Sequence, residues 1–550
     1  MYCEFHIANL ERLGVPSMKK LPLGIQSLRE IIEDGYVYVD KTEYIYNLIS
    51  HAKCYFLSRP RRFGKSLLLD TIGEVFLGEK ELFKGLWIYA SNYGFTKHPV
   101  IRLDMSNIPN DTPDILKDSI SEELAAQSKA ESLELSGKLP GTLFKRLIEG
   151  LHRKYGQRVV VLIDEYDKPI LDHITDYDIA DENRKVLSGF YGILKSMDAH
   201  LRFTFITGVS KFTKTSIFSG MNHLKDITMT EDYANICGIP VDSLDEYFSE
   251  HIENLRTHKR FKDKANLKES ILSWYDGYSW DGETRLLNPF SLLNFFDEKK
   301  FSAFWYSSGS PRFLLDLIRN KPESYTNIKN VRLTEKMLDS IEIDKIAIEP
   351  LLFQTGYLTV KEIPPTHLSP VYIVDLPNLE VSEAFNMHIL SALTDSGDML
   401  AESTRVGMAE ALRSGDLEEV LEILRGLFAS IPYSLHIERE AYYHSIFYAV
   451  LNVLGLDTQV EVLVSKGRID AIIEAGSRVY VMEFKYKSCP PDASSEDRQQ
   501  LSESALGEAM EQINARGYAD KYKGSGKEVI KAAFAFLGRD DIEMRIENCG

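Results

Sequence analysis

The sequence predicts an α/β protein with a parallel-sheet domain near the N-terminus, a helical middle region and a second α/β domain near the C-terminus. Wholly apolar strand-like runs alternate with helical stretches between residues 21 and 230. The stretch 231–385 is rich in aromatic residues, Gly and Pro. Residues 458–487 hold three strand-like runs separated by Gly-containing turns, which is the pattern of a small meander.

Length and composition set the boundaries of this interpretation. A chain of 550 residues is too long for one hydrophobic core, and 44% apolar with 27% charged residues is ordinary for a globular protein. We expect five segments: a lead (1–20), the parallel-sheet domain (21–230), a helical or winged-helix-like lid region (231–385), bridging helices (386–432) and the C-terminal domain (433–550).

The distribution of apolar residues and cysteines indicates a cytoplasmic protein without a membrane partner. No apolar run approaches the roughly 18–20 residues that span a bilayer, and the N-terminus lacks the basic and apolar regions of a signal peptide. The five cysteines are scattered singly, which favours reduced thiols over a zinc site or a disulfide framework.

A candidate phosphate-binding loop follows the first strand of the N-terminal domain. The strand 54–57 enters a loop rich in Arg and Pro, after which Gly64, Lys65 and Ser66 open an apolar helix. In such a loop, backbone N–H groups at a helix N-terminus cradle phosphates, the lysine reaches the β- and γ-phosphates, and the serine can bind Mg²⁺. Arg59 stands where the common pattern has its first Gly, a residue suited to positive φ.

A second motif supports a nucleotide site. The apolar strand 159–164 ends in Asp164 and Glu165. Asp164 is expected to hold Mg²⁺, and Glu165 is expected to polarise the attacking water. Strands at 100–103 and 201–206 complete the predicted sheet, and Thr207 after the last of them would lie beside the phosphates; Ser or Thr after a strand is also ordinary turn chemistry.

Charged residues inside the C-terminal meander form the second candidate site. Asp470 lies in its second strand, and Glu483 and Lys485 share one face of the third. A hairpin closed by Ile473 and Arg478 would place Asp470 opposite Val481 and diagonal to Glu483. Two such carboxylates can hold Mg²⁺, which activates a water against a phosphodiester.

A structural ion pair is the alternative interpretation of the same residues. Asp470 would pair with Lys485, or Glu483 with Arg468, because buried charges need partners.

These motifs in this order resemble a known family. The stretches YVDKTEYI, LSRPRRFGKS, VVVLIDEYDKPIL and FTFITGVSKF are similar to AAA-ATPase-like proteins of the P-loop NTPase class, with GKS as Walker A and IDE as Walker B. GRID followed by E-x-K resembles the metal site of the PD-(D/E)XK nuclease superfamily. The RPRRFGKS form with Arg59 recurs in that ATPase family.

The resemblance implies further site residues. It assigns ATP binding to Arg61, Arg62, Gly64, Lys65, Ser66, Asp164 and Thr207, with Mg²⁺ on Ser66 and Asp164. It assigns Mg²⁺, with Mn²⁺ as a substitute, to Asp470 and Glu483, with Lys485 beside them.

The nuclease superfamily also places an acidic residue on a helix before the meander. Residues 438–454 have helical spacing, and Glu440 is the preferred extra carboxylate, with Glu438 and Glu461 as alternatives. Gln512, on a helix predicted at 502–516, and Tyr518 resemble accessory residues of some branches. The polar segment 490–500 is expected to be a loop.

Charge limits the choice of partner. The net charge of −18 weighs against indiscriminate binding to nucleic acid, so a nucleic-acid groove would have to be local. We expect nucleic acid as the partner, DNA rather than RNA, and homo-oligomers are an open alternative. Arg61, Arg62 and Arg184 are unranked candidates for an arginine finger.

The leading hypothesis is a metal-dependent nuclease that binds and hydrolyses ATP, and the resemblance suggests a role in bacterial defence or mobile-element biology. One alternative is a nucleotide-dependent switch or scaffold whose nuclease fold recognises its target without cutting. Another is an ATPase that acts on protein partners.

Overall fold

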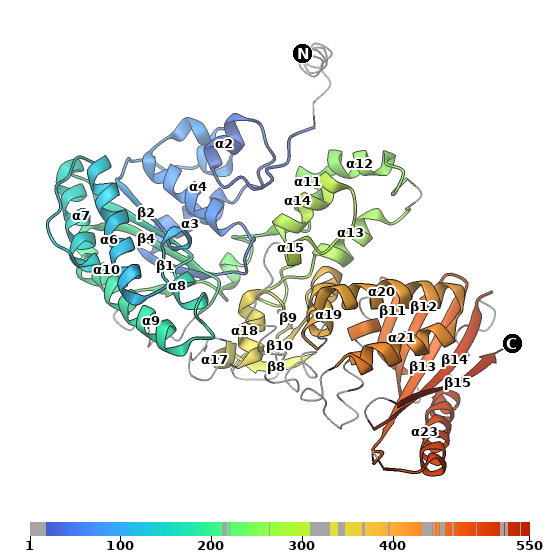
Figure 1. The fold of residues 1–550 in the computed structure, drawn as a ribbon. Coiled ribbons are helices and arrows are strands. Elements are labelled where there is room, and N and C mark those ends of the chain that lie inside the picture. The colour runs from blue at the N-terminus through green and yellow to red at the C-terminus, as the bar shows by residue number, and fades with distance from the viewer. Residues whose placement is uncertain are drawn as a thin grey trace, which may run out of the picture. The chain divides into compact units, whose positions relative to one another are not determined.

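The computed structural model groups the chain into two compact units (Figure 1). The N-terminal unit comprises Met1–Ser308 and Lys329–Glu380, and the C-terminal unit comprises Gly309–Ile328 and Val381–Gly550. The structure describes residues 18–211, 217–218, 221–262, 264–307, 330–338, 347–365, 369–393, 397–431, 443, 446–447, 449–451, 457–464, 467–490, 492–516, 522, 526–538 and 541–549.

A five-stranded sheet with the strand order β2-β3-β4-β1-β5 forms the centre of the N-terminal unit, and all its neighbouring strands are parallel. The predicted strands are present, and three of them are almost wholly buried, as expected for a parallel sheet covered on both faces. Their bounds are Cys54–Ser58 (β1), Val100–Asp104 (β2), Val159–Asp164 (β3), Leu201–Gly208 (β4) and Lys225–Asp226 (β5).

The register brings the carboxyl ends of these strands to one edge of the sheet. Leu57 of β1 pairs with Thr207 of β4, and Asp104 of β2 pairs with Asp164 of β3. Strand β4 lies between β1 and β3, so its carboxyl end separates the loop after β1 from the acidic residues after β3. Ligands of parallel α/β sheets bind at this edge.

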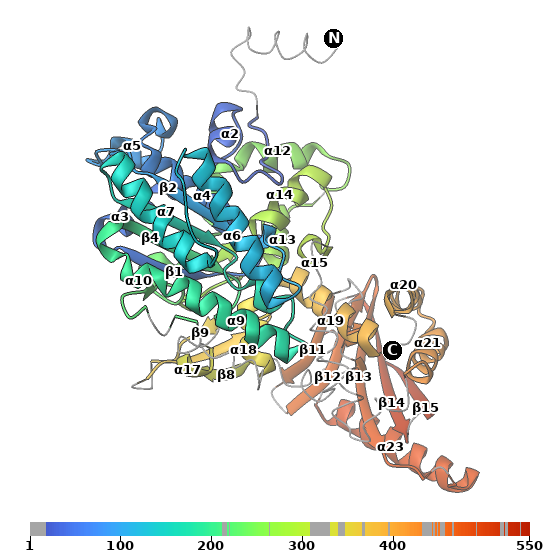
Figure 2. The same cartoon turned by 60° about the vertical axis from the view of Figure 1, so that its left-hand side comes forward.

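Amphipathic helices cover the sheet. Helices α6, α7 and α9 contact one another and lie along one side of the sheet (Figure 2). Helix α7 shows why: its buried residues recur at helical spacing, and Gly156 ends it in a left-handed conformation. The bounds are Leu28–Glu33 (α2), Thr42–His51 (α3), Lys65–Leu77 (α4), Trp87–Ala90 (α5), Pro113–Ala130 (α6), Pro140–Tyr155 (α7), Lys168–Leu171 (α8), Tyr177–Tyr191 (α9) and Ile193–Ser196 (α10).

The region after β5 is helical and carries a small antiparallel sheet with the order β8-β10-β9, which agrees with the expected helical and winged-helix-like character. Its core consists mostly of Phe, Leu and Ile side chains. The helices are Ser243–Tyr247 (α11), Ser249–Thr257 (α12), Leu267–Tyr275 (α13), Pro289–Glu298 (α14), Phe304–Ser307 (α15), Glu335–Leu338 (α17) and Ile348–Thr355 (α18). The strands are Ile239–Pro240 (β6), Leu286–Leu287 (β7), Val331–Thr334 (β8), Thr359–Glu362 (β9) and Val371–Asp375 (β10).

The C-terminal unit contains a mixed sheet with the order β11-β12-β13-β14-β15. The predicted meander is present as β11 (Asp457–Val464), β12 (Gly467–Ala475) and β13 (Arg478–Lys487). Helix α23 (Ser495–Arg516) then crosses over to β14 (Glu528–Leu537), which pairs with β13 in parallel, and β15 (Asp541–Cys549) closes the sheet. Helices that precede the meander in the described ranges include Leu379–Leu393 (α19), Gly397–Ser414 (α20) and Leu417–Ala429 (α21).

The helix predicted at 502–516 is present, but it begins earlier than predicted. Asp416 caps α21 by accepting a hydrogen bond from the backbone N–H of Glu419 at 3.0 Å. The segment 490–500 is not all loop, because α23 begins at Ser495. The backbone N–H of Asp497 donates to the hydroxyl of Ser494 at 3.1 Å, and this cap starts the helix earlier than its apolar pattern does.

Among the helices of the described ranges, none is long and apolar enough to cross a membrane.

Candidate nucleotide and metal sites

The loop between β1 and α4 has the backbone of a phosphate-binding turn. Gly64 stands at the N-cap of α4 in the left-handed conformation, with φ 89°, and Lys65 is the first residue of the helix. Arg62 is also left-handed, with φ 67°. The loop's positive-φ positions are therefore Arg62 and Gly64, and Arg59, which replaces the common first Gly, is not among them.

Arg59 has a structural role that its sequence position does not reveal. Its side chain is fully buried, and its guanidinium donates to the carbonyl oxygens of Ser58 at 2.9 Å and Thr228 at 2.7 Å. The guanidinium also lies 4.0 Å from the ring centroid of Trp280. Burial lowers the pKa of Arg59 to about 10, so the side chain is still a cation at neutral pH. Arg59 thus fastens the start of the loop to the segments after β5 and α13.

The ammonium of Lys65 is directed into its own loop. It donates to the carbonyl oxygens of Arg59 and Pro60, both at 3.0 Å, and the residue is only 5% exposed. These two carbonyls hold the ammonium inside the loop.

Asp164, Glu165 and Thr207 meet at the carboxyl ends of β3 and β4. The hydroxyl of Thr207, which is fully buried, donates to the carboxylate of Asp164 at 2.5 Å. The backbone N–H of Glu165 donates to the same carboxylate at 3.0 Å. Glu165 has a φ of 47°, an unfavourable value for a residue with a side chain, and such strain is typical of functional sites.

A cavity of about 320 Å³ joins the loop to the acidic end of β3. It is lined by Arg61, Arg62, Gly64, Lys65, Ser66, Glu165, Lys168 and residues of 22–26 and α14. Ser66 also lines a neighbouring cavity of about 310 Å³, together with Asp164. The structure therefore gathers the sequence-predicted nucleotide residues around two adjoining cavities that share Ser66, except Thr207, which lines neither cavity.

The lining of the 320 Å³ cavity includes Lys168 as a further basic residue, and it includes only two of the three candidates for an arginine finger. Lys168, which was not predicted, follows Glu165 by three residues and forms an ion pair with Asp172; its only sequence signal was the charged run DEYDK. Arg61 and Arg62 line the cavity, whereas Arg184 is absent from its lining and pairs with Asp181 at 2.6 Å.

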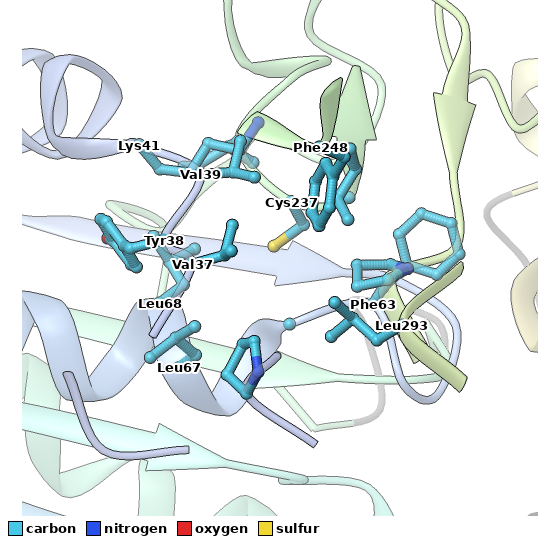
Figure 3. Close-up of a pocket in the computed structure, with 16 residues that line it drawn as sticks. Val37, Tyr38, Val39, Lys41, Phe63, Leu67, Leu68, Cys237, Phe248 and Leu293 are labelled. Atoms are coloured by element: carbon cyan, nitrogen blue, oxygen red, sulfur yellow. The ribbon is translucent and has the colours of Figure 1, made fainter. Parts of the chain in front are cut away.

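A smaller apolar pocket of about 100 Å³ adjoins the cavity of about 320 Å³ (Figure 3). The larger cavity is called the phosphate cavity below. Pro22, Gly64, Leu67, Pro289 and Leu293 line both. The other walls of the apolar pocket come from the segment 37–41, from α4, from the segment 236–239 and from Phe248.

In the C-terminal unit, Asp470 and Glu483 lie directly opposite each other on β12 and β13. The backbone N–H of Asp470 donates to the Glu483 carboxylate at 3.2 Å, and the backbone N–H of Phe484 donates to the Asp470 carboxylate at 3.0 Å. The regular backbone pairing of β12 with β13 ends at Ala471 and Met482. Beyond that pair, the backbone N–H groups of Asp470 and Phe484 donate to side-chain carboxylates instead of to backbone carbonyls. Glu483 is fully buried.

The predicted register of this hairpin was wrong by two residues. Ala475, not Ile473, pairs with Arg478, and Ile472, not Asp470, faces Val481. The turn is shorter than predicted because Gly476 adopts a φ of 63°, which lets two residues reverse the chain. A shift of two residues keeps every side chain on its face, so Asp470 and Glu483 still converge.

Lys485 completes the cluster, with its ammonium 3.4 Å from the Glu483 carboxylate. Ala533 and Ala535 of β14 pair with Glu483 and Lys485, and both alanines are buried in the apolar core that the sheet forms with α23. Two carboxylates are a set that Mg²⁺ accepts, since this ion keeps several waters. Within the described ranges, no group of three or more His, Cys, Asp or Glu side chains gathers as a metal site.

The accessory residues are only partly covered by the structure. Glu440, Glu438 and Tyr518 lie outside the described residues. Gln512 lies on α23, one turn after Glu508, whose carboxylate binds the ammonium of Lys487 at 2.8 Å.

The predicted helix that would carry Glu440 is helical at its described positions between 443 and 451. Phe447 contacts Phe484 with ring centroids 4.6 Å apart, and Tyr443 stacks on Tyr486 at 4.8 Å. Phe484 and Tyr486 alternate with Glu483 and Lys485, so this helix covers the opposite face of the sheet.

Comparisons with known proteins match both units. Residues 22–218 match the model of a predicted AAA-ATPase, and residues 438–545 match the model of the PD-(D/E)XK nuclease superfamily. The chain is 37% identical to an uncharacterised protein in the vnfD 5′ region of Azotobacter chroococcum mcd 1, over 544 residues that make up 97% of this chain and 100% of that protein.

Solved structures show only remote similarity. A crystal structure of a DNA replication initiation factor has a TM-score of 0.23 and 11% identity, covering 75% of this chain and 91% of that one. Drosophila ORC bound to GC-rich DNA and Cdc6 has a TM-score of 0.20 and 10% identity, covering 81% of this chain and 62% of that one.

Proposed function

Because the chain belongs to the family of predicted AAA-ATPases that carry a C-terminal PD-(D/E)XK nuclease superfamily domain, we propose that it is an ATP-dependent, metal-dependent nuclease. In this proposal the N-terminal unit binds and hydrolyses ATP, and the C-terminal unit cleaves phosphodiester bonds, with DNA preferred over RNA. Nucleic acid and ATP are both present in the cytoplasm, where we place the protein. The role in bacterial defence or mobile-element biology comes from the family resemblance.

The nucleotide proposal assigns a role to each group around the phosphate cavity. Lys65, Arg61 and Arg62 would neutralise the phosphates, with backbone N–H groups at the start of α4. Ser66 and Asp164 would hold Mg²⁺, which supplies charge neutralisation on the phosphate oxygens. Glu165 would orient and polarise the attacking water, and Thr207 would hold the Asp164 carboxylate in position.

The nuclease proposal rests on one observation: the buried carboxylates of Asp470 and Glu483 interrupt the ladder between β12 and β13, with the ammonium of Lys485 beside them. Burying two carboxylates together is unfavourable without compensating cations. Two neighbouring carboxylates are a ligand set that suits a divalent cation such as Mg²⁺. Lys485 would orient the attacking water or neutralise charge that develops on the phosphate.

Cleavage assays test the nuclease proposal. Purified full-length protein is incubated with plasmid DNA, single-stranded DNA and RNA, with Mg²⁺ or Mn²⁺, and with or without ATP. We expect cleavage by the wild type and its loss in Asp470→Ala and Lys485→Ala. Lys487→Ala is the matched control, since Lys487 lies on the same strand and pairs with Glu508 instead.

A binding measurement separates the alternatives. Lys65→Ala should abolish ATP binding while the C-terminal unit stays folded, and unchanged affinity would refute the phosphate-loop assignment. If no substrate is cut and ATP still binds, the protein acts instead as a nucleotide-dependent switch with a recognition domain. The acidic balance of residues 431–550, with 14 Lys and Arg against 19 Asp and Glu, is the observation that favours this second function.

A further inference from the structure

The apolar pocket beside the phosphate cavity has the position expected for the ring of a bound nucleotide. Apolar cavities of about 150 Å³ hold a benzene molecule, so this pocket of about 100 Å³ can enclose only part of a purine ring, and it shares walls with the phosphate cavity. A ligand with its phosphates at Lys65 can therefore place an aromatic ring between Val37, Leu68 and Phe248 (Figure 3).

Lys41 is an exception to the apolar character of this pocket. It carries the one charged side chain among the pocket-lining residues that the structure describes, and it comes from the same segment as Val39. Burial lowers the pKa of Lys41 to about 8, against small opposing effects of Cys237 and Asp40. A group with that pKa is still mostly protonated at neutral pH.

The groups around Lys41 do not use its hydrogen bonds. The Asp40 carboxylate accepts instead from the backbone N–H groups of Thr42 at 2.8 Å and Trp87 at 2.7 Å. The hydroxyl of Tyr38 is within 3.4 Å of the Thr71 hydroxyl. Across the described part of the chain, the Lys41 ammonium has neither a hydrogen bond nor an ion pair with a side chain.

An ammonium carries three donors and no acceptor, and leaving it without partners at an apolar wall is costly. A ligand that brings an acceptor offsets this cost. The edges of adenine and guanine carry such acceptors, including the ring nitrogen N7.

We propose that Lys41 is a specificity-determining residue of the nucleotide site, whose ammonium donates a hydrogen bond to an acceptor atom on the edge of a purine base seated in the apolar pocket. This inference rests on the proposed nucleotide-binding function. It adds a contact to the base, distinct from the contacts that Lys65 makes with the phosphates.

Two ligands separate base from phosphate recognition. Calorimetry measures the binding of ATP and of inorganic tripolyphosphate, each with Mg²⁺, to the full-length wild type and to Lys41→Met. We expect Lys41→Met to weaken ATP binding about tenfold and to leave tripolyphosphate affinity unchanged. Lys84→Met, at an exposed position outside the pocket, is the control and should change neither.

The outcomes are distinct. Equal ATP affinity in Lys41→Met and wild type would overturn the inference, and so would an equal loss for ATP and tripolyphosphate, because Lys41 would then be a phosphate ligand. A wild type that binds neither ligand would refute the nucleotide function itself.

A measurement on the wild type alone tests the pocket even if the Lys41→Met variant does not fold. ATP should bind at least tenfold more tightly than tripolyphosphate, because only ATP fills the apolar pocket. Equal affinities of the wild type for the two ligands would overturn the base-binding role of the pocket.

Discussion

The hydroxyl of Thr207 and the carboxylate of Asp164 are joined by a hydrogen bond of 2.5 Å that crosses from β4 to β3. Because β4 separates β3 from the phosphate loop of β1, Thr207 is the side chain through which the acidic end of β3 is tied to the strand beside the loop. The orientation of the Asp164 carboxylate therefore depends on a neutral residue that is itself fully buried.

Thr207→Val keeps the shape of this side chain and removes its donor. A hydrogen bond to a charged group contributes about 1.5–3 kcal/mol, so we expect the kcat of ATP hydrolysis to fall about tenfold or more. The affinity for ATP should change little, because the phosphate loop is untouched. Steady-state hydrolysis and calorimetric binding measure the two quantities.

Thr204→Val is the matched control for this substitution, since Thr204 is buried earlier in the same strand. An unchanged kcat in Thr207→Val would show that Asp164 needs no support from β4.

Arg59→Gly restores the glycine of the common phosphate-loop pattern and should nevertheless destabilise the N-terminal unit. The substitution removes the bonds to Ser58 and Thr228 and the contact with Trp280, and it leaves a buried carbonyl without its donor. We expect a loss of about 3 kcal/mol in the free energy of unfolding. Denaturant titration followed by Trp fluorescence measures this.

Arg61→Gly provides the comparison, because Arg61 is exposed in the same loop. If Arg59→Gly were as stable as Arg61→Gly, the anchoring role of Arg59 would be wrong.

The N-terminal sheet and Arg59 show which features could be predicted from the sequence and which could not. The strands of the N-terminal sheet were predictable because each is an apolar run of strand length, and their order placed Lys65 and Asp164 at one edge. The role of Arg59 was not predictable, because its acceptor on Thr228 and its ring partner Trp280 come from distant segments.

In the C-terminal site, too, one feature could be predicted from the sequence and another could not. Alternation along β13 was enough to place Glu483 and Lys485 on one face. The register depended on whether the turn used two residues or four, and only the backbone conformation of Gly476 decides that. The apolar pocket was missed because its walls come from six separated parts of the chain, at residues 22, 37–41, 63–68, 236–239, 248 and 289–293.

Mg²⁺ should stabilise the C-terminal unit if Asp470 and Glu483 hold the ion. A ligand that binds only the native state adds about 1.4 kcal/mol at ten times its Kd, which appears as a raised unfolding temperature of this unit. We expect Asp470→Ala to abolish the increase and Glu511→Gln, at an exposed position on α23, to retain it. An equal increase in Asp470→Ala would place the ion elsewhere.

Lys41 gives a stability signature that depends on pH. Its pKa in the native state, about 8, lies below the ordinary value of 10.5, so between these values the unfolded chain binds more protons than the native one. The contribution of Lys41 to the free energy of unfolding therefore rises with pH in this window. We expect Lys41→Met to be more stable than the wild type at pH 7, and the difference to shrink towards pH 10.5.

Urea midpoints of both proteins at pH 7, 8.5 and 10 measure this difference. Cys237 and Asp40 interact electrostatically with Lys41 and are present in both proteins. A difference that stays constant across the three pH values would show that the Lys41 ammonium is not penalised by burial.

The parallel pairing of β13 with β14 has a consequence for the order of events during translation. The hairpin of β12 and β13 can form as soon as it leaves the ribosome, because its contacts are local. Strand β13 receives its second neighbour only after α23 and β14 have also been synthesised. The growing chain therefore completes its ATPase-like sheet long before the strand that carries Glu483 and Lys485 is enclosed, and a nascent polypeptide stalled before β14 has no finished C-terminal sheet.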